Sequence, residues 1–539
     1  IITRQRGDNL KGNKIVKYIF IIFVIAIMGF AIYTVNKEEK TKEEPTQNTT
    51  TTAKEDDEIG KELTLGIAEY DTINPILSNN KYVQEISKTI YDSLIDITDE
   101  YKIEKNLLKD WAKTSETTYL LKLRDDIKWS DGQKLTIDDV IYTIDILKNI
   151  PSIYSYNVQY VIRTDIIDEN TIQLTLDHEI PFFEYNLIFP IMSKKYYEGQ
   201  VFNNTEKNNM PVGTGKYKII QNNDNEIILV QNDQYTRSNL TLEKITIGKY
   251  SSLGELYNAF KLGKIDLITT TNENIQNNIG TMGYNIKEVD GREFDFIALN
   301  TQNQILADKE VRKAISYAIN RENIIGTIYN NKYKISYYPL DYGSYLNGDE
   351  SGISYNTNKA IETLENAGWE VRNGKWQKVE NYRTKTINLK LVVQESNQSR
   401  SAIADMIKAS LEEINIKVTL IKANDNLYQA YLQNKNYDMI LTGVSESANP
   451  NLALYFGADN LANYNNDEIN QIMSEVKNIT KEEMLIEKYK KVKEIYNEEI
   501  PYIGLYNSYY AIISSWNLKG NISGNWYNIF KDIDNWYKN

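Results

Sequence analysis

This sequence almost lacks the two residue types, cysteine and histidine, on which thiol catalysis, histidine-activated nucleophiles and most transition-metal sites depend. Cysteine is absent and His178 is the single histidine. Thiol catalysis, Ser-His-Asp machinery and zinc sites built on Cys or His are therefore nearly excluded. His178 stands where a predicted strand meets a turn, and we expect it at the surface. The sequence predicts no catalytic residue, no metal site and no cofactor.

Two pairs of adjacent carboxylates could superficially suggest a glycosidase. They are Asp125 with Asp126 and Asp138 with Asp139. Neighbouring residues on a strand or helix point in different directions, so neither pair suits two carboxylates that flank one bond at about 5–9 Å. The glycines at 213 and 215 lack the spacing of a phosphate-binding loop and predict a turn that enters a strand. These residues favour binding over catalysis.

The composition indicates a folded, secreted chain of several domains. Hydrophobic residues make up 41% and charged residues 25% of the 539 residues, as in globular proteins. The formal net charge of -13 disfavours nucleic acid as a partner, because binding to a phosphate backbone needs clustered Lys and Arg. An acidic surface suits a soluble extracellular domain.

The N-terminal part of the sequence predicts a membrane anchor followed by a tether. Residues 18–35 carry no charge, and about 18 residues in a helix nearly cross a hydrocarbon core of about 30 Å. Residues 1–17 are basic, which places them in the cytoplasm and the rest of the chain outside. A cleaved signal peptide is the alternative, but its apolar region is usually about 7–15 residues long and ends in small residues. Residues 36–58 are polar and charged and predict a disordered tether.

Strand and helix signals alternate from residue 59 onwards, where we expect the folded part to begin. Residues 61–68 predict a strand and residues 82–94 a helix, whose apolar positions share one face. Thr136 is expected to cap a helix that runs to residue 147. Further strands are predicted at 118–128, 171–176, 211–220, 227–230, 245–247, 387–393, 417–421 and 437–442, and further helices near 308, at 358–367 and at 400–414. This pattern indicates an α/β fold with mixed sheets.

Seven segments, taken in order, resemble the extracellular solute-binding proteins that serve oligopeptide, dipeptide and nickel importers. They are IYDSLIDIT at 90–98, LRDDIKWSDGQKLTIDDVIYTI at 123–144, MPVGTGKYKI at 210–219, FIALNT with KEVRKAISYAINRENII within 296–325, SYNTNKAIETLENAGW at 354–369, YDMILTG at 437–443 and IPYIGLY at 500–506. The family usually has a proline where this chain has Lys216. The resemblance covers the chain from Leu63 onwards and is strongest to oligopeptide-binding proteins.

The resemblance implies a two-lobed clamp of the periplasmic-binding-protein type, class II, in its large three-domain version with mixed sheets, here preceded by one transmembrane helix. The implied parts are a cytoplasmic segment 1–17, the anchor 18–35, the tether 36–58, lobe I from 59–98, 212–294 and 508–539, an extra domain 99–211, and lobe II 295–507. Within lobe II, Arg312 and Arg321 are interpreted as a helix-surface charge and a helix-end cation.

In this family the bound peptide is held as an added strand, so main-chain groups supply most of the affinity. Two stretches match the family's backbone clasps. One is the loop of Asn79, Asn80 and Lys81, and the other is the strand end 442–444, which comprises Thr442, Gly443 and Val444.

Glu446 lies four residues before Pro450, where peptide binders of the family carry an Asp that pairs with the ligand's α-amino group. Glu446 keeps the charge but is one methylene longer. Gly443 replaces a tryptophan that often shapes a side-chain pocket, so the pocket is wider here or filled by another aromatic residue. Tyr506 is a further candidate for ligand contact, and no residue is assigned to the ligand's carboxylate.

The sequence therefore predicts a monomeric, membrane-anchored binding protein that captures short extended peptides and delivers them to the permease and ATPase subunits of an ABC importer. One alternative is a receptor that binds a signalling peptide without import. Another is a binder of a non-peptide solute such as nickel or haem, although the usual soft and imidazole ligands are missing.

Overall fold

The computed structural model describes residues 60–348 and 351–539. The expected cytoplasmic segment 1–17, the anchor 18–35 and the tether 36–58 lie outside the described residues. Within the described ranges, no helix combines the length and apolar character needed to cross a bilayer.

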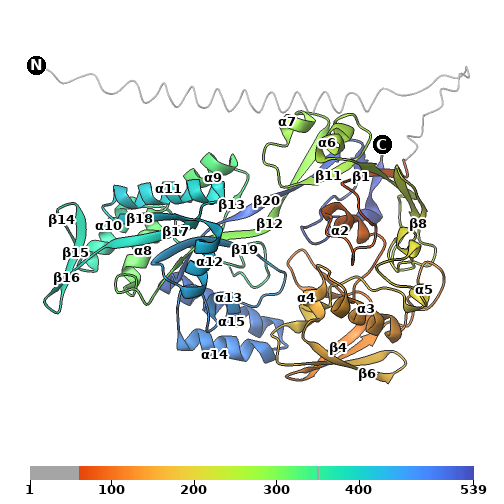
Figure 1. Cartoon of the computed structure of the whole chain (residues 1–539), viewed down its shortest axis with the longest axis horizontal. Helices are drawn as coiled ribbons and strands as arrows, with labels where there is room; N and C mark the ends of the chain where they lie inside the picture. The colour runs from red at the N-terminus through yellow and green to blue at the C-terminus, as the bar shows by residue number, and fades with distance from the viewer. Residues whose placement is uncertain (1–59, 349–350) are drawn as a thin grey trace, which may run out of the picture. The chain divides into compact units, whose positions relative to one another are not determined.

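Two long antiparallel strands, β12 (Tyr284–Leu299) and β20 (Tyr502–Ser515), connect two lobes (Figure 1). They belong to one sheet of order β11-β20-β12-β19-β17-β18, in which β11 is Leu267–Thr270 and the short β13 (Lys334–Ile335) also pairs with β20. The register of β12 and β20 shifts between Asp290 and Phe294 and again next to Asp295. The two lobes therefore share a sheet whose pairing is irregular between them.

The first lobe contains a sheet of order β1-β10-β9-β8, in which β1 and β10 are parallel. Its strands are β1 (Glu62–Ala68), β8 (Tyr217–Asn222), β9 (Glu226–Gln231) and β10 (Lys244–Tyr250), and its helices are α2 (Lys81–Ser87), α6 (Leu253–Lys261) and α7 (Gln276–Ile279). Leu63, Leu65 and Ile67 alternate along β1 and are buried. This alternation confirms the predicted strand, because every second side chain of a strand faces one side.

A second sheet, of order β4-β5-β7-β6, lies within the part of the sequence that precedes β8. Its strands are β4 (Leu108–Ser115), β5 (Thr118–Leu123), β6 (Val161–Asp168) and β7 (Thr171–Leu176), and around it lie β2 (Ile95–Ile97), β3 (Ile103–Lys105), α3 (Ile137–Asn149), α4 (Ser155–Val158), α5 (Lys194–Tyr197) and the 3-10 helices Phe183–Leu187 and Glu206–Asn209. Thr136 and Asp139 form a capping box at the start of α3. The predicted cap is confirmed.

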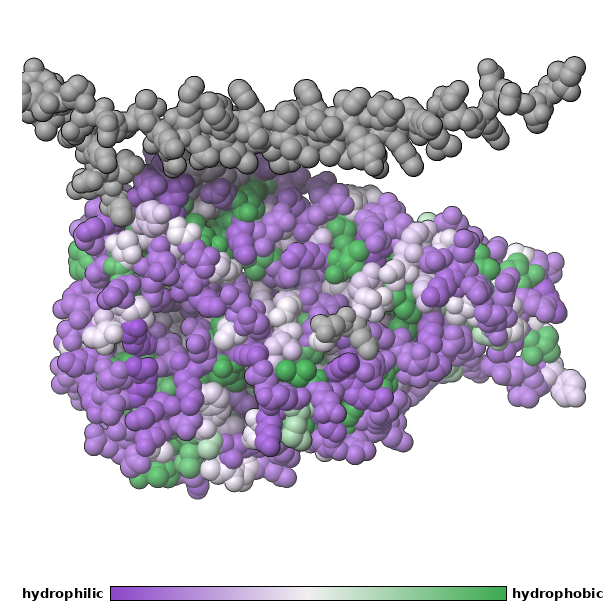
Figure 2. Space-filling model, turned by 180° about the vertical axis from the view of Figure 1, so that it is seen from behind, coloured by the Kyte–Doolittle hydropathy of each residue, from purple (hydrophilic) through white to green (hydrophobic). Residues whose placement is uncertain are grey.

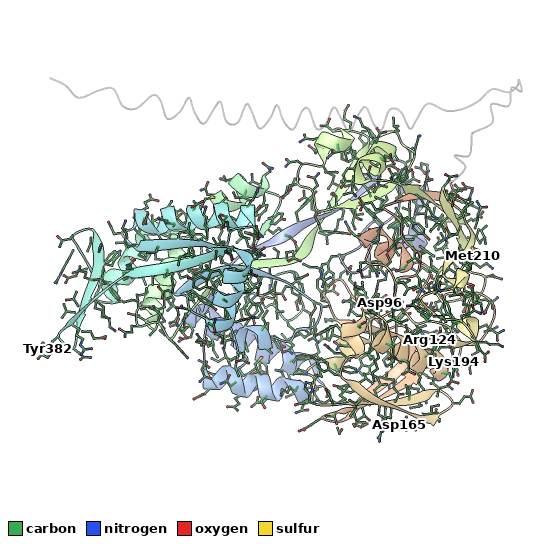
Figure 3. All side chains as sticks on the ribbon, in the orientation of Figure 1. Asp96, Arg124, Asp165, Lys194, Met210 and Tyr382 are labelled. Atoms are coloured by element: carbon green, nitrogen blue, oxygen red, sulfur yellow. The ribbon has the colours of Figure 1, made fainter. Side chains whose placement is uncertain are left out.

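In the second lobe, helices cover the parallel strands β17 (Asn388–Gln394), β18 (Lys417–Ala423) and β19 (Met439–Ser445) (Figure 1). The helices are α8 (Lys309–Ala318), α9 (Arg321–Tyr329), α10 (Thr357–Asn366), α11 (Gln398–Glu413), α12 (Asp425–Asn434), α13 (Ala453–Phe456), α14 (Asp467–Glu475) and α15 (Glu482–Glu499), with a 3-10 turn at Val476–Asn478. A meander of β14 (Glu370–Arg372), β15 (Lys375–Glu380) and β16 (Arg383–Thr386) projects from this lobe, with Tyr382 at its tip (Figure 3).

The chain ends beside the first lobe. Here β21 (Leu518–Lys519) pairs with β22 (Tyr537–Lys538), a 3-10 turn covers Ile533–Asn535, and Gly60 bonds to Lys538. The visible face of the described residues is mainly hydrophilic with scattered hydrophobic side chains (Figure 2). His178 is exposed, as predicted, and its Nδ1 lies 2.6 Å from Asp177.

The helix predicted at 82–94 ends much earlier than expected, at Ser87. The following residues bond to the strand-entry turn instead: Ile90 O accepts from Gly215 N and Thr89 O from Tyr217 N, each at 2.9 Å. A Cβ added at Gly213 would lie 1.9 Å from Ile90 O. Close packing of the two backbones requires glycine there and takes Thr89 and Ile90 out of the helix.

The interpretation of Arg312 and Arg321 as surface or end charges is wrong, because each side chain is only 3% exposed. Arg312 donates to Leu306 O and Glu499 O, both at 2.7 Å, and pairs with the Glu499 carboxylate at 3.2 Å. Arg321 starts α9 and donates to Gly504 O at 2.7 Å. A guanidinium with several donors can satisfy carbonyls at chain crossings, and local sequence does not show that α15 and β20 cover these positions.

Candidate functional site

A cavity of about 530 Å³ lies beside α2, the middle of β12 and β20, and the end of β19. Its walls are formed by Lys81, Gln84, Glu85, Lys88, Ile153, Tyr154, Asn157, Ile188, Thr271, Gly291, Arg292, Glu293, Ser445, Ser447, Ala448, Ser508, Tyr509, Tyr510, Trp526 and Tyr527. A larger hollow of about 760 Å³ between β4 and residues 477–485 includes none of the predicted site residues. The first cavity is therefore the candidate binding site, and its volume is typical of small-ligand pockets.

The predicted clasp at 79–81 divides into three different environments. Asn79 is exposed, whereas Asn80 caps α2: its Oδ1 accepts from Tyr82 N at 2.9 Å and its amide donates to Ala68 O at 2.8 Å. Lys81 lines the cavity, with Nζ 4.8 Å from the centroid of the Tyr510 ring. The side chain of Asn80 is thus used within the fold, and Lys81 is the member of this clasp that reaches the cavity.

The clasp predicted at 442–444 lies on β19, whose outer edge is largely unpaired in the described residues. β19 pairs with β12 from Met439 to Ser445 but with β17 only at Met439 and Ile440. Glu446 N donates to Arg292 O at 2.8 Å, so Glu446 and Arg292, which lie opposite each other, are a hydrogen-bonded pair of the antiparallel ladder. Because such pairs alternate along antiparallel strands, Gly443 and Ser445 direct their N–H and C=O groups away from β12, whereas Thr442 and Val444 direct theirs towards it.

Glu446 follows β19 and stands between two residues of the cavity wall, Ser445 and Ser447. The Tyr455 hydroxyl donates to its Oε1 at 2.5 Å. Burial raises the pKa of Glu446 to about 7, against the opposing effects of the Tyr455 hydrogen bond and the charge of Arg292. Within residues 60–348 and 351–539, Glu446 forms no ion pair. A half-buried carboxylate beside the cavity thus has a hydroxyl partner but no ion pair.

The space above Gly443 is filled by a buried ion pair. Arg400 donates from Nε and Nη2 to the two carboxylate oxygens of Asp295, each at 2.7 Å. A Cβ added at Gly443 would lie 2.0 Å from Asp295 Oδ1 and 2.2 Å from Arg400 Nη2. The structure therefore shows neither a wider pocket at Gly443 nor an aromatic replacement, because charged groups take the volume that a larger side chain would need.

Tyr506 lies against this ion pair and is not part of the cavity wall. Its hydroxyl donates to Asp295 Oδ2 at 2.6 Å and lies 3.0 Å from the Tyr329 hydroxyl. The side chain is buried, and burial raises the pKa of Tyr506 well above its usual value. Its position indicates that Tyr506 holds the Asp295 carboxylate in place within the second lobe.

The aromatic wall of the cavity was not predicted from the sequence. Tyr509 and Tyr510 come from β20, Trp526 and Tyr527 from the C-terminal segment, and Tyr154 from the start of α4. The Arg292 guanidinium lies 4.6 Å from the Trp526 ring. The abundance of tyrosine was the only signal available, and it does not distinguish the few that line a cavity from the many that fill a core.

The comparisons with known proteins agree with this architecture. The chain has two lobes with a cavity between them (Figure 1). The profile of the family described as bacterial extracellular solute-binding proteins, family 5, matches residues 102–466, and the chain belongs to this family.

Individual relatives are distant but cover most of the chain. The oligopeptide-binding protein AppA of Bacillus subtilis is 21% identical over 485 residues, covering 83% of this chain and 86% of AppA. The nickel-binding protein NikA of Staphylococcus aureus is 22% identical over 395 residues, with 71% and 76% covered. The solved structure of the murein tripeptide-binding protein MppA in its unliganded open form matches with a TM-score of 0.76 at 17% identity, covering 89% of this chain and 97% of that one. The relatives are substrate-binding proteins of ABC transporters, so this chain is a binding protein and not an enzyme.

Proposed function

We propose that this protein captures short peptides in the cavity between its lobes and delivers them to the permease and ATPase of an ABC importer. The observation that carries the proposal is Glu446, a half-buried carboxylate beside the cavity with no ion pair among the described residues. A peptide's α-ammonium would supply the missing cation, since a buried charge is costly without a partner. This supports the amine-anchoring role expected from the sequence.

The open edge of β19 supplies the second part of the proposal. Gly443 and Ser445 direct backbone groups away from β12, and Ser445 also lines the cavity. An extended peptide that pairs with this edge would be held mainly through its main chain, which binds many sequences with similar affinity. On the opposite wall Lys81 is the clasp residue within reach.

Closure of the two lobes completes the proposed mechanism. We take lobe I as residues 59–98, 212–294 and 508–539, and lobe II as residues 295–507. The strands β12 and β20 join the two lobes, and their register shifts provide a place where the strands can bend. A ligand that contacts both walls binds the closed form better and shifts the population towards it. The permease would then recognise the closed monomer.

Calorimetry with the full chain tests the proposal. A short peptide such as Ala-Ala-Ala should bind, and its N-acetylated form should bind at least about tenfold more weakly, because acetylation removes the ammonium that Glu446 pairs with. Equal affinity for both forms would remove the amine-anchoring role. Mass spectrometry of copurified material adds a second reading: mixed peptides agree with nutrient import, one defined peptide with a signalling receptor, and no peptide with a non-peptide solute.

We also propose that residues 18–35 hold the protein in the membrane with the binding domain outside. The support is the uncharged run itself and the basic segment before it. Replacing residues 1–35 with a cleavable secretion signal should release the protein into the medium, whereas the native chain should sediment with membranes and be sensitive to external protease. Release of the native chain in a shortened form would contradict the anchor.

A further inference from the structure

One face of α2 forms the first-lobe wall of the cavity. Lys81, Gln84, Glu85 and Lys88 all line it, and their spacing of three, four and seven residues places them on a single helix face, with Lys88 at the helix end. Two of these side chains are cations, so the wall presents ammonium groups opposite the wall that holds Glu446.

Three of the four residues are satisfied within the protein. The Glu85 carboxylate accepts from Thr269 at 2.8 and 2.9 Å and from Tyr510 at 2.5 Å, and it lies 3.6 Å from Lys81 Nζ. Gln84 accepts from the Tyr154 hydroxyl at 2.7 Å, and its amide donates to backbone carbonyls of the loop before α2. Lys81 is therefore neutralised by Glu85, and Gln84 ties this wall to its neighbours.

Lys88 differs from the other three because its ammonium has only an aromatic partner. Nζ lies 3.9 Å from the centroid of the Tyr527 ring and forms no ion pair or hydrogen bond with any described residue. Burial raises the pKa of Asp96 and the charge of Lys88 opposes this shift, but the two side chains do not form an ion pair, and Asp96 Oδ1 accepts from Ile97 N. Arg292, the remaining cation of the cavity, faces Glu293 and Glu446 and donates to Glu446 O at 2.9 Å.

A cation–π contact offsets only part of what an ammonium loses when water is excluded. Closing the lobes on a ligand removes water from the cavity, so the Lys88 ammonium would gain from direct contact with an anion, and no described carboxylate forms an ion pair with it. A carboxylate is the anionic group that peptides carry, either at the C-terminus or on an Asp or Glu side chain.

We propose that Lys88 binds a carboxylate of the peptide ligand, so that the site selects peptides whose negative group reaches α2 while their amine reaches Glu446. This inference rests on the proposed function, because it takes a peptide as the ligand. The two facing walls of the cavity then carry opposite charges, and the favoured ligand is a short zwitterion or an acidic peptide.

The test measures affinities of the full chain by calorimetry, using two matched pairs of probes. Ala-Ala-Ala and its C-terminal amide report on the terminal carboxylate, and the amides of Ala-Glu-Ala and Ala-Gln-Ala report on an acidic side chain. In the native protein, the affinities of the two probes in at least one of these pairs should differ by about tenfold or more, with the carboxylate-containing probe binding more tightly. Lys88→Gln should abolish that preference, and Lys88→Arg should keep it.

Lys249→Gln is the matched control, because Lys249 also has an aromatic partner, with Nζ 4.0 Å from the centroid of the Tyr70 ring, but is not part of the cavity wall, so the substitution should leave the preference intact. Circular dichroism checks that each variant folds, and the Lys88→Arg variant keeps the test informative if Lys88→Gln is unstable. A preference that survives in Lys88→Gln, or no preference in the native protein, overturns the inference. N-acetylated Ala-Ala-Ala separates the two proposals: if acetylation weakens binding but amidation and the Glu side chain have no effect, only the role of Lys88 fails.

Discussion

The Tyr455 hydroxyl donates a hydrogen bond of 2.5 Å to Oε1 of Glu446, at the edge of the cavity. This contact favours the charged carboxylate, whereas burial favours the protonated form, and the balance raises the pKa of Glu446 to about 7. The protonation state of Glu446 therefore changes within the physiological range. Any ligand that pairs an ammonium with it has a pH-dependent affinity.

The first prediction is a bell-shaped pH dependence of peptide binding. Pairing with an ammonium lowers the pKa of Glu446, so the complex binds fewer protons than the free protein and affinity falls as pH drops below about 7. Above about 8 the peptide's own α-amine loses its proton, and affinity falls again. Calorimetry from about pH 5 to about pH 9 should show the highest affinity between about pH 7 and about pH 8.

Two variants identify the acidic limb of that curve. Tyr455→Phe removes the hydrogen bond that favours the carboxylate, so the acidic limb should move to higher pH while the alkaline limb stays in place. Glu446→Gln should weaken binding by about tenfold or more and leave no acidic limb. An acidic limb that persists in Glu446→Gln would assign it to another group and contradict the prediction.

The second prediction concerns the unpaired edge of β19. Ser445→Pro removes an N–H that points away from β12, so the protein should fold with nearly native stability but bind peptides about two- to tenfold more weakly. Val444→Pro removes an N–H that points towards β12 and should lower the free energy of unfolding by about 3 kcal/mol. Urea unfolding and calorimetry of both variants separate the two effects, and similar behaviour of the pair would contradict the assigned alternation.

The third prediction concerns the packing above Gly443. Gly443→Ala would place a Cβ 2.0 Å from Asp295 Oδ1, so the Asp295 and Arg400 side chains must shift, at a cost of about 1–3 kcal/mol in stability. Asp295→Asn leaves Arg400 buried without its carboxylate and should cost about 3–5 kcal/mol.

Asp405→Asn is the control for this pair, because Asp405 forms an exposed ion pair with Lys422 at 2.7 Å and should cost at most about 1 kcal/mol. Urea unfolding measures all three variants. If Asp295→Asn is as mild as Asp405→Asn, the ion pair above Gly443 does not support the second lobe.

Local periodicity predicted most elements of the fold because their burial alternates or repeats along the chain. The strand at 171–176, the cap of Thr136 and the helix that begins near residue 308 are where the sequence placed them. The helix at 82–94 was too long, since its early end depends on backbone contacts with Gly213 and Gly215, which lie far along the chain. Periodicity contains no information on such a contact.

The candidate site was less predictable than the fold. A short motif placed Glu446 beside the cavity, but its partner Tyr455 and the ion pair of Asp295 with Arg400 come from separate elements brought together by the sheet. Lys88 lies on a predicted helix, yet only the structure shows that Tyr527, from the C-terminal segment, is its neighbour. Charges whose partners are distant in sequence cannot be assigned from local spacing.

The fourth prediction concerns a contact between the part of the chain that holds the sheet β4-β5-β7-β6 and the second lobe. Glu179 lies between Lys113, at 2.9 Å, and Lys477 of the second lobe, at 3.2 Å. Glu179→Gln removes the charge that holds the two lysines together and leaves them facing each other. The closed population should fall, peptide affinity should weaken by about two- to fivefold, and the radius of gyration of the ligand-free protein should rise.

Glu169→Gln provides the matched control for Glu179→Gln. Glu169 pairs with Lys134 at 3.3 Å, and both residues precede β8 in the part of the chain that holds the second sheet, so this ion pair does not join the lobes. The control should change neither affinity nor the radius of gyration measured by small-angle X-ray scattering. Because Glu179 and its two lysines are still partly exposed, salt screens their ion pairs, and the difference between the two variants should shrink between low and high ionic strength. Equal effects of the two substitutions at low salt would show that Glu179 does not influence closure, and an effect that salt leaves unchanged would assign its role to packing.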